Sequence, residues 1–308
     1  MEPGVSCFDP LKLFAAAESR CGGTEEFPMR ETIPVNMDHF GLISQRSELE
    51  QVFFDLGFTA ETGRKKPVVG ADGKHPGSSY FVFDNAYFDC THSTSPFFDF
   101  LLGKCGGTGM CYFEFASRDI QAAYDNLRAH GIATCEVNIS SRYADHGEKK
   151  GEAVFACTTP DEVLPIHVMY GGVEHRTPEL FYDNERYLHD NSAFRLDEVV
   201  MLCDSQKICD ETKELIKIIQ PDDTPVRPDG GIRKLTLLSR EEAVKEYGLD
   251  LPEKTDNTAG IRLYVKDASI IRALAERAGY PTHLCESTLV IDLVAPVNLF
   301  LLVNEAKT

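Results

Sequence analysis

The chain has 308 residues, of which 43% are hydrophobic and 26% are charged. This length and composition are typical of a globular protein with a substantial core, arranged as two domains or one large composite domain. The formal net charge of −18 argues against binding to nucleic acid or an anionic membrane, because both need clustered basic side chains. We therefore expect a small-molecule partner, no nucleic acid and no membrane, and we leave a homodimer open.

The ten cysteines are scattered without a CxxC motif, and several lie in apolar, strand-like runs. This pattern predicts reduced, mostly buried thiols in a cytoplasmic protein. No run approaches the roughly 18 consecutive apolar residues that a membrane helix needs. Residues 1–30 lack the basic start and apolar core of a signal peptide, so we expect no export, and residues 11–17 predict a docking helix.

The first regular part of the chain reads as a strand at 38–44 followed by a helix at 47–56 that ends at Gly57. A polar loop precedes two more strand-like runs, 80–83 and 86–91. If one further strand follows Gly57, this first module has the order βαβββ.

The same order recurs along the chain. Gly57, Gly131 and Gly279 each end a predicted helix, and they lie 74 and 148 residues apart, which indicates four modules. The third module is the least regular, with a strand from residue 198 and a helix at 206–219. The remaining predicted elements of modules two and four are the strands 110–116, 134–139, 153–157, 164–170, 261–265, 289–294 and 299–303, and the helices 119–130 and 269–278.

Tandem βαβββ modules with a histidine on the first strand resemble the vicinal oxygen chelate superfamily of glyoxalases, extradiol dioxygenases and antibiotic-resistance proteins, and most closely its glyoxalase-like domain proteins. Four short motifs carry the resemblance: Asp38-His39-Phe40-Gly41-Leu42, His75-Pro76-Gly77, Tyr87-Phe88-Asp89 and Leu164-Pro165-Ile166-His167. The resemblance implies an α+β fold in which four modules pair into two curved, cup-shaped mixed sheets with helices outside.

The resemblance also implies a divalent metal inside the cup, held from the first and last strands of both modules. Its ligands here would be His39, Asp89 and His167, a two-histidine, one-carboxylate set that suits Fe, Mn, Zn or Ni. The usual fourth position falls near Met110 or Tyr112, neither a normal ligand for these metals. Two interpretations stay open: a metal site, or hydrogen-bonded pocket histidines in a cup that binds an organic ligand without metal.

Strand alternation assigns the other side chains of the cup. Phe40 and Leu42 would cover the helix, which leaves His39 toward the cup. On the first strand of module two, Phe113 and Phe115 would likewise face the helix, and Met110, Tyr112 and Glu114 the cup.

Glu114 and Tyr112 are our candidates for acid–base or substrate-polarising roles, since a carboxylate in a partly apolar cup has a raised pKa. A carboxylate at a solvated rim is the other interpretation of Glu114. His75 and Arg142 are candidates for substrate binding, the first from a loop at the mouth and the second by bidentate hydrogen bonds to an anionic group. A turn residue and a solvated arginine are their alternatives.

We therefore expect a leader at 1–35, a glyoxalase-like domain with the site at 36–182 and a degenerate second domain at 183–308. The leading hypothesis is a metal-dependent lyase, isomerase or dioxygenase of this type that acts on a small oxygen-rich or aromatic metabolite. The alternative is a non-catalytic protein that sequesters a small molecule in the same cup without metal.

Overall fold

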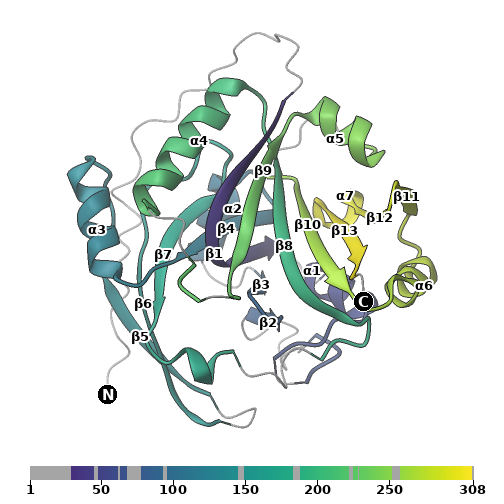
Figure 1. The fold of residues 1–308 in the computed structure, drawn as a ribbon, viewed down its shortest axis with the longest axis horizontal. Helices are drawn as coiled ribbons and strands as arrows, with labels where there is room; N and C mark the ends of the chain where they lie inside the picture. Colours follow the sequence, from purple (N-terminus) through teal and green to yellow (C-terminus); the bar gives the residue numbers. More distant parts are fainter. Residues whose placement is uncertain are drawn as a thin grey trace.

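The computed structural model describes residues 29–44, 48–61, 63–67, 78–92, 96–144, 149–182, 188–221, 225–227, 229–251 and 257–306. Within them the chain forms one mixed sheet of 13 strands with helices packed against it, which confirms the α+β class (Figure 1). The strands are β1 (Arg30–Ser44), β2 (Ser78–Val82), β3 (Tyr87–His92), β4 (Gly109–Ala116), β5 (Asn138–Ala144), β6 (Gly151–Thr158), β7 (Met169–His175), β8 (Ala193–Leu202), β9 (Ile232–Leu238), β10 (Ala259–Val265), β11 (Thr282–Cys285), β12 (Thr288–Leu293) and β13 (Leu299–Glu305). The helices are α1 (Glu48–Asp55), α2 (Pro96–Lys104), α3 (Ile120–Ala129), the 3₁₀ turn η2 (Pro178–Leu180), α4 (Gln206–Ile219), α5 (Arg240–Tyr247), α6 (Ala268–Ala278) and α7 (Val294–Val297).

The four predicted modules are visible in the strand pairing. In each module the first and last strands are parallel neighbours: β1 with β3, β4 with β7, β8 with β9 and β10 with β13. The first strands of successive modules then pair antiparallel, β1 with β4 and β8 with β10. Modules two and four have all four strands, whereas the described residues of module one form three strands and those of module three form two.

The predicted glycines end their helices for a conformational reason. Gly57, Gly131 and Gly279 have φ of 80°, 76° and 82°, in the left-handed region that a glycine enters without steric cost. Such a residue turns the chain away after the last helical turn. The regular spacing of these glycines is therefore a direct record of the repeated modules.

Strand β1 connects the two halves of the molecule. Its first half pairs antiparallel with β9 from module three, and its second half pairs with β3 and β4. The two expected sheets are consequently joined into one, with β1, β9 and β8 between the strands of modules two and four (Figure 1). Residues 30–35, which we expected in the leader, belong to this strand, and the predicted helix at 11–17 lies outside the described residues.

The main hydrophobic core lies between the sheet and helices from both halves. It includes Phe40, Phe53 and Phe113 from the first half and Ile216 and Leu301 from the second. Because this core is continuous across β1, the halves stabilise each other. No helix in the described part of the chain is long and apolar enough to cross a membrane.

Candidate functional site

A cavity of about 320 Å³ opens between the strands of modules one and two, at the position of the predicted cup. Its walls combine aromatic rings with a small number of polar groups, as is usual for small-molecule sites. The polar and charged lining residues include His39, Asp89, Tyr112, Glu114, Arg142 and His175, and the aromatic ones include Tyr80, Tyr87, Phe98, Phe155 and Phe181.

A β-bulge in β1 sets which side chains reach this cavity. Met37 pairs with Phe115 and His39 with Glu114, so Asp38 is an extra residue without a partner on β4. The bulge shifts the alternation by one position, and Met37 and Phe40 therefore both lie in the core. His39 faces the cavity, as the sequence predicted.

A second register shift corrects the prediction for Met110. Gly41 pairs with Tyr112, but the next residue, Leu42, pairs with Met110, so Cys111 is passed over. Met110 is consequently buried in the core instead of lining the cup. Phe113 and Phe115 lie in the same core, and Tyr112 and Glu114 line the cavity, as expected.

Asp89 and Tyr112 form a buried hydrogen-bonded pair at the base of the cup. The Tyr112 hydroxyl donates to Asp89 Oδ2, while Asp89 Oδ1 has no partner among the described residues. Burial raises the pKa of Asp89 to about 7, against the opposing effect of the Tyr112 hydrogen bond. The pair can therefore present a carboxyl that gains or loses a proton near neutral pH.

Gly41 makes room for this pair. A Cβ atom at residue 41 would lie 1.8 Å from Tyr112 Cε1, so only glycine lets the phenol ring lie over β1. Tyr112 then reaches across to Asp89, which pairs with Gly41 on the neighbouring strand β3.

We expect Gly41→Ala to expel the Tyr112 ring from its place and to lower the free energy of unfolding by about 1–3 kcal/mol. Urea unfolding measures this loss. The control is Gly103→Ala in α2, where an added Cβ would meet nothing within 4 Å. Alanine also has a higher helix propensity than glycine, so this variant should lose no stability. Equal stability of the two variants would contradict the expectation.

Glu114 lies on β4 opposite His39, and its carboxylate covers the backbone of Gly171 on β7. Burial, and after it the charges of Asp38 and Asp89, raise the pKa of Glu114 to about 8. Glu114 Oε2 is buried and has no partner within the described chain. At neutral pH Glu114 therefore carries a proton that it can donate to a bound oxygen.

His39 is held on both sides. Its ring stacks on Tyr87 with centroids 4.2 Å apart and meets the Tyr112 ring edge-on at 5.9 Å. Its Nδ1 lies 3.0 Å from Asp38 Oδ2. Burial lowers the pKa of His39, although Asp38 opposes this, so the imidazole is neutral near pH 7.

Arg142 enters the cup from β5. Its guanidinium lies 4.3 Å from the centroid of the Tyr80 ring and 4.7 Å from that of Phe181. Stacking on two rings fixes the plane of the guanidinium while its edge stays available for hydrogen bonds. The other predicted substrate-binding residue, His75, lies outside the described residues.

His167 does not join the predicted metal ligands. The last strand of module two was predicted to begin at residue 164, but β7 begins at Met169, and residues 164–168 form a tight turn closed by a Leu164–Val168 bridge. His167 has φ of 60° in this turn and is exposed. It lines a small cavity beside Cys203 instead of the cup.

A divalent metal does not fit the side chains as they are placed. The cup contains His39, Asp89 and Glu114, which are suitable donors by type. However, no three His, Cys, Asp or Glu side chains in the described ranges are grouped so that they could hold a metal ion. The predicted set of His39, Asp89 and His167 is thus not assembled, and we derive no chemistry from it.

Two polar residues next to the cup, Asp38 and His175, were not predicted from the sequence. Asp38 precedes His39 directly, and strict alternation would have turned it toward the helices. His175 ends β7, whose Gly171-Gly172 pair was the available signal, since glycines inside a strand mark a close approach to a neighbouring group.

The corresponding face of the C-terminal half is filled. Arg262 donates to Glu198 at 2.6 Å and to Asn304 at 2.9 Å, and both members of the ion pair are largely buried. Tyr247 of α5 packs over this face with Phe300. The half that we expected to lack a site has an ion pair and apolar side chains where the first half has its cup.

Comparison with solved structures places the fold. A mutant of 4-hydroxymandelate synthase from Streptomyces coelicolor matches 89% of this chain and 93% of its own, with a TM-score of 0.51 and 13% identity. A xylose isomerase-like TIM barrel/4-hydroxyphenylpyruvate dioxygenase fusion protein matches 92% of this chain, with a TM-score of 0.50 and 12% identity, and this chain spans 50% of that protein. A hypothetical protein from Staphylococcus aureus matches 88% of this chain and 99% of its own, with a TM-score of 0.50 and 8% identity.

No protein-family model matches the sequence, and no curated protein matches it. The first two of these structures are vicinal oxygen chelate proteins. The chain therefore has the fold of that superfamily, which confirms the resemblance carried by the sequence motifs at the level of architecture.

Proposed function

We propose that the cup of modules one and two is the active site of an enzyme that moves a proton next to a carbonyl group in a small aromatic 2-oxo acid. The observation that carries the proposal is the combination in one aromatic cavity of a neutral His39 with two carboxyls, Asp89 and Glu114, that bear protons near neutral pH. A base beside fixed acids is the arrangement that keto–enol interconversion needs.

Each group has a role in this reaction. Arg142 binds the substrate carboxylate, and the rings around the cavity cover its aromatic part. Glu114 or Asp89 transfers its proton to the carbonyl oxygen, and His39 Nε2 accepts the proton from the neighbouring carbon. The enol forms with no oxidant; return of one proton from His39 to carbon and of the other from oxygen to the carboxylate completes the cycle. The fold neighbours that are named for 4-hydroxyphenylpyruvate and 4-hydroxymandelate support an aromatic acid as the substrate, and the first of these names is that of a 2-oxo acid.

The test is exchange of the methylene protons of 4-hydroxyphenylpyruvate with deuterium, followed by proton NMR in D₂O. We expect the protein to accelerate exchange, His39→Gln to lose roughly 100-fold or more of that acceleration, and His130→Gln, an exposed residue at the end of α3, to keep it. Treatment with a chelator is expected to leave the rate unchanged. Loss on chelation and recovery with a divalent metal would contradict the metal-free chemistry.

The second candidate function is capture of the same class of ligand without turnover. It is favoured by the engagement of Asp89 by Tyr112, which leaves one oxygen of that carboxyl for a ligand. Calorimetric titration and the exchange assay together distinguish the two candidates: binding of the oxo acid with no exchange supports capture, and binding with exchange supports the enzyme.

A further inference from the structure

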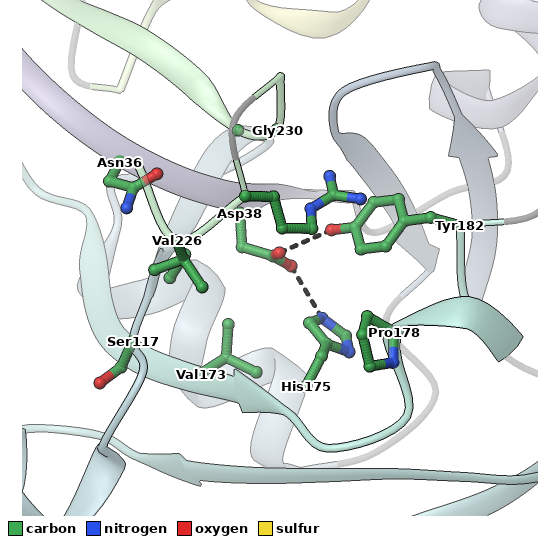
Figure 2. A pocket seen from close by; sticks show the side chains of 12 residues that line it. Asn36, Asp38, Ser117, Val173, His175, Pro178, Tyr182, Val226 and Gly230 are labelled. Atoms are coloured by element: carbon green, nitrogen blue, oxygen red, sulfur yellow. Dashed lines mark hydrogen bonds and ion pairs between the residues drawn. The ribbon is translucent and has the colours of Figure 1, made fainter. Parts of the chain in front are cut away.

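Asp38 lies on the far side of His39 from the cup, in a second cavity. This cavity has a volume of about 150 Å³ and is formed by β1, β4 and β7 together with Val226, Arg227, Gly230 and Gly231 of module three (Figure 2). Among its lining residues are Asn36, Ser117, His175, Tyr182 and Arg227. The bulge in β1 is the reason that Asp38 reaches this cavity while His39 reaches the other.

Three groups surround the Asp38 carboxylate. His39 Nδ1 and His175 Nε2 each lie 3.0 Å from Oδ2, and the Tyr182 hydroxyl lies 2.6 Å from Oδ1. Figure 2 shows Tyr182 and His175 converging on Asp38 from the wall of the cavity. Burial alone would raise the pKa of Asp38, but the interaction with His175 and the hydrogen bond from His39 together outweigh burial and hold this pKa well below its usual range.

An ionised carboxylate only accepts hydrogen bonds, so each of these neighbours must be the donor. The proton of neutral His39 is then on Nδ1, and the lone pair of Nε2 is turned away from Asp38. The same logic orients imidazoles in other proteins, where the hydrogen bond of one ring nitrogen sets the state of the other.

The C-terminal half holds this arrangement through Arg227. The guanidinium carbon of Arg227 lies 3.3 Å from the centroid of the Tyr182 ring, and its Nη2 donates to the backbone oxygen of Asn85 at 2.6 Å. Arg227 belongs to the segment between α4 and β9, in module three. A stacked cation thus keeps the Tyr182 ring in the position from which its hydroxyl donates to Asp38.

We propose that Asp38 is a positioning residue that fixes His39 as the Nδ1–H tautomer with Nε2 available to the cup. We also propose that Arg227, from the C-terminal half, supports this arrangement by holding Tyr182 against Asp38. The catalytic meaning of the inference rests on the proposed function, since it matters for turnover only if His39 accepts a proton. The tautomer itself is a property of the resting protein and needs no substrate.

The experiment is nitrogen-15 NMR of the histidine rings in the full chain labelled at histidine, with the His39 signals assigned by their loss in His39→Gln. We expect the pattern of a protonated Nδ1 and an unprotonated Nε2 for His39. In Asp38→Asn the preference for this tautomer should be lost, because an amide can donate as well as accept. The control Asp190→Asn changes an exposed carboxylate paired with Lys65 and should leave the His39 signals unchanged.

Tyr182→Phe keeps the ring under Arg227 and removes only the hydroxyl, so it serves if Asp38→Asn fails to fold. Without this hydroxyl Asp38 Oδ1 is no longer fixed and the carboxylate can turn away from His39 Nδ1, so we expect the His39 tautomer to shift partly toward Nε2–H. A His39 that is protonated on Nε2 in the unmodified protein, or unchanged signals in both variants, would overturn the inference.

The exchange assay separates the inference from the proposed function. If the tautomer responds as expected but no aromatic oxo acid exchanges its protons, the proposed function fails and the positioning of His39 stands. If exchange occurs and Asp38→Asn retains both its rate and the His39 tautomer, the positioning role fails and the proposed function stands. We expect the rate of Asp38→Asn to fall roughly 100-fold.

Discussion

Glu114→Gln is expected to stabilise the protein by up to about 5 kcal/mol at pH 8 and above, and to change its stability little at pH 4. The pKa of Glu114 is raised from 4.5 to about 8 in the folded protein, chiefly by burial. Between these values the unfolded chain has already lost the proton that the folded chain keeps. The unfolded state is therefore favoured progressively as the pH rises from about 4.5 to about 8, and glutamine removes this penalty.

Urea unfolding at a series of pH values between 4 and 9 measures the difference. The control is Glu211→Gln on α4, whose exposed carboxylate faces Lys207, and its difference from the unmodified protein should not grow with pH. If the Glu114→Gln difference were the same at pH 4 and pH 9, the carboxyl would not be held neutral in the fold. The role of Glu114 as a proton donor in the cup would then have no basis.

Much of the fold could be read from local patterns. Alternation separated Phe40 and Leu42 from His39, and the helix-ending glycines marked the modules, because both signals arise from the geometry of one short segment. The pairing of β1 with β9 could not be read in this way, since it joins residues about 200 positions apart along the chain. Such pairing depends on which edges remain free once the modules have formed.

Most of the side chains around the cavity could also be predicted from local patterns. His39, Asp89, Tyr112 and Glu114 were expected in the cup and Arg142 was a candidate for substrate binding, and the structure places all five around one cavity.

Asp38 and His175 could not be predicted at the site, for two structural reasons. The bulge at Asp38 adds a residue to the strand without any glycine or proline to announce it. The turn at 164–168 delays β7, so that His175 and not His167 reaches the site from that strand. A shift of a few residues in one strand is enough to exchange one histidine for another.

The C-terminal half shows why a repeated fold does not repeat the site. At the place where module one has an open cup, Glu198 and Arg262 form an ion pair whose side chains are 5% and 15% exposed. Thr236 also donates to Glu198, and Asn304 accepts from Arg262. These groups satisfy one another, in contrast to Asp89 and Glu114, each of which has a buried oxygen without a partner in the described chain. The polar groups on this face therefore stabilise the fold by pairing with one another.

Arg262→Met is therefore expected to lower the free energy of unfolding by about 3–5 kcal/mol, because it leaves the Glu198 carboxylate buried without its cation. Urea unfolding at pH 7 measures the loss. The control Lys234→Met breaks the more exposed pair with Asp197 and should cost less than about 1 kcal/mol.

The double variant Glu198→Leu/Arg262→Met separates the cost of an unpaired charge from the value of the pair itself. Replacing both charges by apolar groups removes the need to desolvate either, so we expect the double variant to recover most of the stability that Arg262→Met loses. If the double variant were as unstable as the single one, packing of the Arg262 side chain, and not the charge of Glu198, would be the larger contribution. Recovery would mean that this half needs only a filled interior, whereas the first half has buried carboxyl oxygens without a partner in the described chain.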